Sequence, residues 1–251
     1  MPAFAFLLGA SAVVRVASLN LCTDEYLLLL AQPDQVVSVS YLSRDPLESP
    51  LWQAARRYHG NRGSLEDVLT LLPTLVLTMG GGGRATRLLA SRLHMQALNL
   101  PYATNLEGVE RNLETVAAAL GNEQRARPWI EKIEELRRSS PRQLTDAIWV
   151  SGHGESLAPG SLGAEWLKLA GFKQRALPGA RATLETLLTN PPKMLIKSNY
   201  RSGQMSGGVQ WLNHPIVRHA GARQIVTDGR PWTCMGPLMI GEIERLRRLA
   251  R

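Results

Sequence analysis

The sequence has little cysteine and no long apolar run. Two cysteines in 251 residues exclude a disulfide-rich scaffold. Hydrophobic residues make up 44% and charged residues 20%, which excludes an intrinsically disordered chain. No apolar stretch reaches the roughly 18 residues that a membrane-spanning helix needs. The composition therefore indicates a globular protein of one large domain or two compact ones.

Common catalytic and nucleotide-binding signatures are also missing. There is no G-x-S-x-G elbow, no H-E-x-x-H and no G-x-G-x-x-G after a strand. Gly80–Gly83 is rich in glycine, but no Lys-Ser or Lys-Thr pair follows, so a Walker A loop is excluded. Flexibility, or a close approach of backbone to a bulky ligand, explains these glycines better.

Positive charge is in excess, with 29 Lys and Arg against 21 Asp and Glu and a net charge of +8. This balance favours an anionic partner: nucleic acid, a membrane surface or an acidic small ligand. The arginine clusters at Arg137–Arg138 and Arg245–Arg251 fall at the ends of expected helices, where cations complement the helix dipole. Without a basic stripe interleaved with aromatics, no nucleic-acid partner is predicted.

The first residues, Met1–Ala12, are apolar and end in Ala-Ser-Ala. This pattern is typical of a signal peptide with its cleavage site, although the usual cationic start is missing. It predicts export of the protein. The alternative is a frayed N-terminus or a first buried strand.

Two segments of the chain repeat the same pattern. Ser64–Leu77 and Thr183–Ile196 share a hydroxyl residue, Leu-Glu, further leucines, threonine, proline and a closing apolar run. In each copy the hydroxyl residue is a good N-cap, the leucines form one face of a helix and the proline ends it. The apolar run suits a buried strand.

The elements around each copy also correspond. The pattern predicts strands at Val13–Leu19 and Ala147–Ser151, and further elements after each copy. These are, in the first half, a helix at Arg84–Leu98, a strand at Pro101–Thr104 and a helix at Gly108–Leu120, and, in the second, a helix at Gly207–His219, a strand at Arg223–Thr227 and a helix at Pro237–Ala250. Alternating strands and helices predict an α/β fold of two similar Rossmann-like lobes, residues 13–120 and 141–251, each with a mostly parallel sheet and a ligand cleft between them.

Residues 121–140 should join the lobes as one long helix. Apolar residues recur at helical spacing through Asn122–Arg138, with charge on the other faces. Pro128 either lies in the first helical turn or kinks the helix. A helical connection predicts stiff lobes that close with small amplitude.

Together, these features resemble the periplasmic substrate-binding proteins of ABC importers for metal chelates: ferric siderophores, haem and cobalamin. The resemblance rests on the two lobes, the joining helix and motifs in a fixed order from about Arg15 to Leu249. These motifs are Arg15–Asp24, the Leu-Glu motif in both lobes, His214-Pro215 and Trp232–Pro237. It implies a monomeric, periplasmic, non-enzymatic receptor without an intrinsic cofactor, whose ligand contains iron or cobalt and whose partner is an ABC permease.

Glu66 and Glu185 occupy the same place in the two copies. A carboxylate in a first helical turn complements the helix dipole, which is a purely structural explanation. The resemblance implies more, because in this family such glutamates, one on each lobe, form salt bridges to arginines of the permease. We therefore expect Glu66 and Glu185 to dock the protein on its permease.

The ligand is expected beyond the carboxyl ends of the strands, where loops of both lobes meet. These loops contain flat aromatic side chains, Tyr41, Tyr200 and Trp232, suited to a macrocycle or a catechol. They also contain Arg44, Arg84 and Arg201, suited to carboxylate or phosphate groups, although each could equally be a solvated loop charge. His153 could ligate iron or cobalt axially, or be polar surface. The sequence shows no metal-ligand spacing, so no metal site of the protein's own is predicted.

Cys22 and Cys234 each fall in an expected cleft loop, one on each lobe, and either form a disulfide across the cleft or remain free thiols.

The alternative function is a two-lobed α/β enzyme, a transferase or hydrolase, acting on an anionic small molecule. Gly152–Ser156 is superficially similar to a hydrolase site but lacks the glycine spacing.

Overall fold

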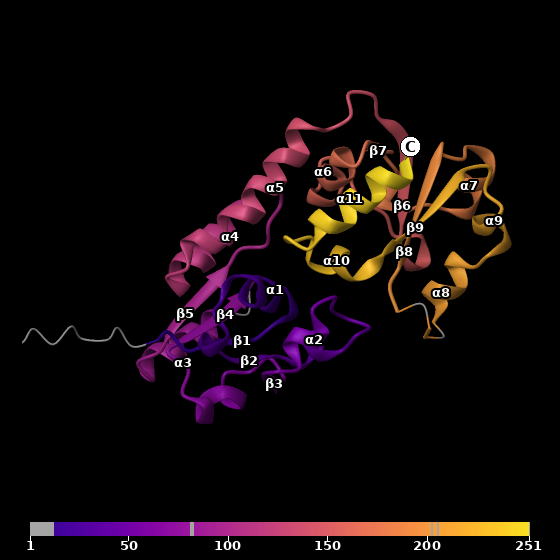
Figure 1. Ribbon diagram of the computed structural model, residues 1–251. Helices are drawn as coiled ribbons and strands as arrows, with labels where there is room; N and C mark the ends of the chain where they lie inside the picture. Colours follow the sequence, from indigo (N-terminus) through magenta and orange to yellow (C-terminus); the bar gives the residue numbers. More distant parts are fainter. Residues whose placement is uncertain (1–12, 81–82, 202, 205, 251) are drawn as a thin grey trace, which may run out of the picture.

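A computed structural model describes residues 13–80, 83–201, 203–204 and 206–250. The predicted signal peptide, Met1–Ala12, lies outside the described residues. The described chain folds into two α/β lobes, each built on one sheet whose paired strands are all parallel (Figure 1). The predicted fold class is therefore confirmed. No helix among these residues is long and apolar enough to cross a membrane.

The N-terminal lobe contains a five-stranded sheet of order β3-β2-β1-β4-β5. Its strands are β1 Val16–Ser18, β2 Val36–Ser40, β3 His59–Asn61, β4 Leu75–Met79 and β5 Gln96–Leu100. Its helices are α1 Leu21–Leu30, α2 Trp52–Ala55, α3 Gly83–Arg92 and α4 Leu106–Leu120, with 3-10 turns η1 Pro33–Gln35, η2 Tyr41–Arg44 and η3 Glu66–Leu71.

The C-terminal lobe contains a four-stranded sheet of order β7-β6-β8-β9. Its strands are β6 Thr145–Val150, β7 Phe172–Gln174, β8 Met194–Asn199 and β9 Arg223–Asp228. Its helices are α6 Leu162–Leu169, α7 Leu184–Thr189, α8 Gly207–Leu212, α9 Pro215–Arg218, α10 Gly229–Cys234 and α11 Met239–Ala250, with 3-10 turns η5 Gly152–Gly154 and η6 Pro178–Ala180.

Burial of the first strand of each half explains why the sheets form. All three residues of β1 are buried, and Val16 pairs with Val36 on one side and Leu75 on the other. In the second half, β6 is flanked in the same way by β7 and β8. One apolar core cluster runs through both lobes, because residues of α1 and α4 join it with residues of α6 and α11. The lobes therefore share part of their core.

Two antiparallel helices, rather than one, connect the lobes along one side of the molecule (Figure 1). After α4 comes a short turn, η4 Glu123–Arg125, and then α5 Arg127–Arg138, with Pro128 in its first turn. Near the end of α5, Arg137 forms ion pairs with Glu107 and Glu110 near the start of α4. The predicted joining helix is present, but it begins at Arg127 and is braced by α4.

Three predicted boundaries differ in the structure. The helix expected to run to Leu98 ends at Arg92, because His94 has a left-handed backbone (φ 55°), and strand β5 then pairs with β4 at 96–100 instead of 101–104. The helix expected at Gly207–His219 is two helices, since Pro215 starts a new one whose N-cap is His214. The first Leu-Glu copy forms the 3-10 turn η3 instead of an α-helix. Arg15 donates to the backbone carbonyls of Leu71 and Leu72 at the end of this turn.

Candidate functional site

A cavity of about 390 Å³ lies at the carboxyl ends of β6 and β8. These neighbouring strands are where the C-terminal sheet changes direction, the place where open α/β sheets bind ligands. The cavity brings together three of the predicted ligand residues, His153, Tyr200 and Arg201. The remaining lining is mostly polar or glycine, with two apolar side chains, and comes from Ser151, Gly152, Glu155, Ser198, Gln204, Ser206, Gly208, Val209 and Leu212.

Close packing of glycines brings α8 against this cavity. A Cβ atom on Gly152 would come within 2.9 Å of the Cα atom of Gly208, so neither position has room for a side chain. His153 has a left-handed backbone (φ 59°), and a Cβ atom on Gly207 would lie 2.7 Å from its ring. His153 is therefore held at the start of α8 with its side chain exposed.

A second cavity, of about 490 Å³, lies between the lobes. Pro46 and Leu47 line it from the N-terminal lobe, and Arg201 lies in the wall of both cavities. The other lining residues come from the C-terminal lobe: Asn199, Gly203, Val226, Thr227, Asp228, Arg230, Glu242 and Arg245. The two cavities therefore meet at Arg201.

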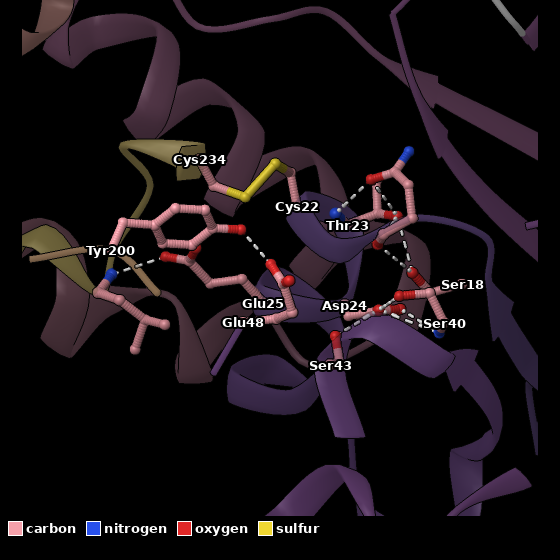
Figure 2. The surroundings of a disulfide bond; sticks show 12 residues. Ser18, Cys22, Thr23, Asp24, Glu25, Ser40, Ser43, Glu48, Tyr200 and Cys234 are labelled. Atoms are coloured by element: carbon pink, nitrogen blue, oxygen red, sulfur yellow. Dashed lines mark hydrogen bonds between the residues drawn. A yellow bond between two sulfur atoms is a disulfide. The ribbon is translucent and has the colours of Figure 1, made fainter. Parts of the chain in front are cut away.

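Polar contacts close the two lobes over these cavities. Glu48, which follows η2, is only 4% exposed, and its carboxylate accepts from the Tyr200 hydroxyl and pairs with Arg201 (Figure 2 shows Glu48 and Tyr200). Arg230 donates to the carbonyl of Pro46 at 2.9 Å and pairs with Asp228 at 2.6 Å. The hydrogen bonds that Arg230 donates to the Asp228 carboxylate raise the pKa of Arg230. Sequence reasoning missed Glu48 and Arg230, since partners on the other lobe leave no local pattern.

The two exposed tyrosines of the N-terminal lobe lie at strand ends. Tyr41 begins η2 directly after β2 and is 56% exposed. Tyr102, which the sequence analysis did not select, follows β5 and is 67% exposed. Gly80 has a left-handed backbone (φ 78°), and a Cβ atom there would collide with the ring of Tyr102. The start of the glycine-rich segment therefore makes room for this ring.

The other three predicted ligand residues lie elsewhere. Trp232 is only 4% exposed and packs against Trp149 in a tilted arrangement, with 5.1 Å between ring centroids, and its Nε1 donates to Thr227 Oγ1 at 2.8 Å. The prediction that it presents its face to a ligand is wrong, because its ring completes the core beneath β9. The side chain of Arg44 lies over Gly60 of β3. Arg84, exposed in the first turn of α3, lines neither cavity.

The base of the cleft is held by a disulfide between Cys22, in the first turn of α1, and Cys234, the last residue of α10 (Figure 2). Their Cα atoms are 5.3 Å apart. One helical turn after Cys22, the buried Glu25 accepts the backbone N–H of Leu238 at 2.7 Å. Burial raises the pKa of Glu25 to about 8, although this hydrogen bond lowers it. Helix α1 is thus tied to the C-terminal lobe at two points.

Next to this attachment, Asp24 holds the η2 turn in place. Its carboxylate accepts the backbone N–H of Ser40 at 3.0 Å and the hydroxyls of Ser40 and Ser43 at 2.5 Å each (Figure 2). Burial raises the pKa of Asp24 to about 6, although hydrogen bonds from these serines lower it. These hydrogen bonds fix the path of the chain from the end of β2 through η2.

Glu66 and Glu185 are both exposed, Glu66 as the first residue of η3 and Glu185 in the first turn of α7. Thr183 caps α7 by accepting the N–H of Thr186 at 3.0 Å, and Ser64 accepts the N–H of Asp67 at 3.3 Å. Each copy of the motif therefore presents an exposed carboxylate beside a hydroxyl that accepts a backbone N–H, in a 3-10 turn on one lobe and in an α-helix on the other. Among the residues that the structure describes, no group of three or more His, Cys, Asp or Glu gathers as a metal site.

The chain matches the family model described as "Periplasmic binding protein" over residues 16–173, more than half of its length. It therefore belongs to the periplasmic binding protein family. The family comprises binding proteins, and the enzyme alternative finds no support. No curated protein sequence matches the chain significantly.

Solved structures share the whole fold. The periplasmic haem-binding protein HutB of Vibrio cholerae is 19% identical, with a TM-score of 0.73 over 95% of this chain and 99% of that chain. A periplasmic haem-binding protein from Pseudomonas aeruginosa is 20% identical, with a TM-score of 0.66 over 94% and 92%. The vitamin B12-binding protein BtuF of Vibrio cholerae is 18% identical, with a TM-score of 0.63 over 94% and 95%.

Proposed function

We propose that this protein captures a metal chelate of the haem, ferric siderophore or cobalamin type in the periplasm and delivers it, as a monomer, to an ABC permease. The observation that carries the proposal is the pair of cavities at the strand ends, one walled by both lobes and the other by the C-terminal lobe, which meet at Arg201. Their volumes, about 490 and 390 Å³, fall in the range of small-molecule sites. The fold shared with haem- and B12-binding proteins supports the same function.

The exposed side chains around the cleft suit such a ligand. Tyr41 and Tyr102 offer flat faces for a macrocycle from the N-terminal lobe, and Arg201 offers a forked donor for an acid group from the C-terminal lobe. The metal would arrive inside the ligand, and His153 or a tyrosine hydroxyl would at most complete its coordination. No resident cofactor is needed for this task.

Delivery requires recognition by the permease. We propose that Glu66 and Glu185, exposed on separate lobes, pair with basic residues of the permease. Two carboxylates held apart by a stiff body give a directional docking pattern that is weakened by salt. Docking in this manner needs no contact between the permease and the bound ligand.

Native mass spectrometry with haemin, a ferric siderophore and cyanocobalamin tests ligand capture. One of these should bind with 1:1 stoichiometry and be recovered chemically unchanged. Tyr41→Ala and Tyr102→Ala should each weaken its binding about tenfold, because an aromatic contact contributes about 1–1.5 kcal/mol. Leu88→Ala, on the exposed face of α3, is the control and should bind normally. Chemical turnover of the ligand, or no binding of any chelate, would contradict the proposal.

A further inference from the structure

The carboxylate of Glu48 contacts side chains of the opposite lobe that line a cavity. Glu48 belongs to the N-terminal lobe, whereas Tyr200 and Arg201, which both contact it, line the cavity at the end of β8. An ionised carboxylate that is 4% exposed needs such partners, because burying it unpaired is costly. The protein therefore supplies an acid group of its own at this position.

Arg201 is arranged for this pairing. Its backbone is left-handed (φ 50°), its Nη1 donates to Gln204 Oε1 at 3.2 Å, and its guanidinium lies 6.0 Å from the Tyr200 ring centroid. These contacts leave its other donors toward Glu48. A guanidinium held in this way binds one carboxylate well, so a second carboxylate has to displace the first.

We propose that Glu48 is a specificity-determining residue that competes with the ligand for Arg201. A chelate that carries a carboxylate replaces Glu48 at Arg201 and keeps the arginine paired. A neutral chelate leaves Arg201 with Glu48 and gains nothing from it. This inference rests on the proposed function, and it narrows the preferred ligand to chelates with an acid group.

The surrounding structure allows the exchange. Asp45, Pro46 and Leu47, directly before Glu48, are partly or fully exposed, so a small movement returns the released carboxylate to water. The base of the cleft remains closed by the Cys22–Cys234 disulfide. Separation of Glu48 from Arg201 therefore moves the mouth of the cleft without separating the lobes.

The test compares two ligands with the same macrocycle: ferric protoporphyrin IX, with two free propionates, and its dimethyl ester. Affinities are measured by tryptophan fluorescence for the wild type, Glu48→Gln and Asp34→Asn. Asp34→Asn is the matched control, because it removes one negative charge from an exposed site in η1. Glu48→Gln should bind the free acid about tenfold more tightly, since the competing charge is gone, and change the ester by less than about twofold. The control should change neither affinity.

A second measurement needs no ligand. Hydrogen exchange of the free protein should be faster in Glu48→Gln at 44–50 and at 198–201, because the inter-lobe pair is lost. Equal changes for acid and ester, weaker binding of the acid, or unchanged exchange at both segments would overturn the proposal. If the wild type binds neither porphyrin but binds a chelate without a free carboxylate, the preference for an acid group is overturned, while the proposed capture of a metal chelate stands.

Discussion

Cys22 and Cys234 lie 212 residues apart in sequence, yet they join the first turn of α1 to the end of α10 across the lobes. A link that closes so long a loop restricts the unfolded chain strongly. Replacing both cysteines by serine should lower the free energy of unfolding by about 4 kcal/mol. Denaturant unfolding of wild type and Cys22→Ser/Cys234→Ser checks this value.

A reducing agent provides the control for this prediction. It should lower the stability of the wild type and leave the double variant unchanged. Titration of thiols in unfolded, unreduced protein should find none, and two free thiols would contradict the linkage.

The buried carboxyl of Glu25 should make stability depend on pH. Its folded pKa, about 8, lies above the ordinary 4.5, so the folded state favours the protonated form. The resulting stabilisation is fully present below about pH 4.5 and is lost as pH rises through 8. Glu25→Gln keeps an acceptor for the Leu238 N–H but carries no charge. The variant should therefore be more stable than wild type at pH 9, on the order of 2 kcal/mol.

Thermal unfolding between pH 4 and 9 measures this effect. Glu131→Gln, at an exposed position of α5, is the control and should follow the wild type at every pH. Asp24, with its pKa raised from 3.8 to about 6, should add a further loss of stability as the pH rises through 6, and all three proteins should share it. Parallel curves for Glu25→Gln and wild type would rule out a titrating Glu25.

Trp232 should act on stability and hardly on the ligand. Trp232→Ala removes a buried ring that packs against Trp149 and should lower the free energy of unfolding by about 3–5 kcal/mol. Trp232→Phe refills most of the space but loses the hydrogen bond to Thr227, and should cost less. Denaturant unfolding measures both. Normal stability of Trp232→Ala together with weakened chelate binding would instead indicate that Trp232 contacts the ligand.

Loss of the two docking carboxylates should separate transport from binding. In Glu66→Ala/Glu185→Ala, uptake by cells should fall at least about tenfold, because the paired charges on the permease lose their partners. Chelate affinity of the purified protein should stay unchanged. Glu131→Ala/Glu134→Ala, with the same charge change on the exposed face of α5, should transport normally. Equal uptake by both double variants would contradict docking through Glu66 and Glu185.

Local patterns predicted the two-lobed α/β fold, because the repeated Leu-Glu motif and the apolar strands carry their own periodicity. The predicted position of β5 was wrong because nothing in the sequence marks His94 as the left-handed residue that ends α3. Trp232 was misplaced because an indole suits a core and a binding cleft equally well. Glu48 was missed because its partners lie on the other lobe, about 150 positions further along the chain.

The antiparallel pair α4 and α5 bears on how this protein can move. Glu165 of α6 accepts the first backbone N–H of α4 at 2.8 Å, and Arg137 fastens the end of α5 to the same end of α4. The two helices are therefore held together as one unit. Two helices fastened side by side resist bending within their common plane more than bending out of it. Opening of the mouth of the cleft should therefore tilt one lobe mainly out of the plane that contains α4 and α5.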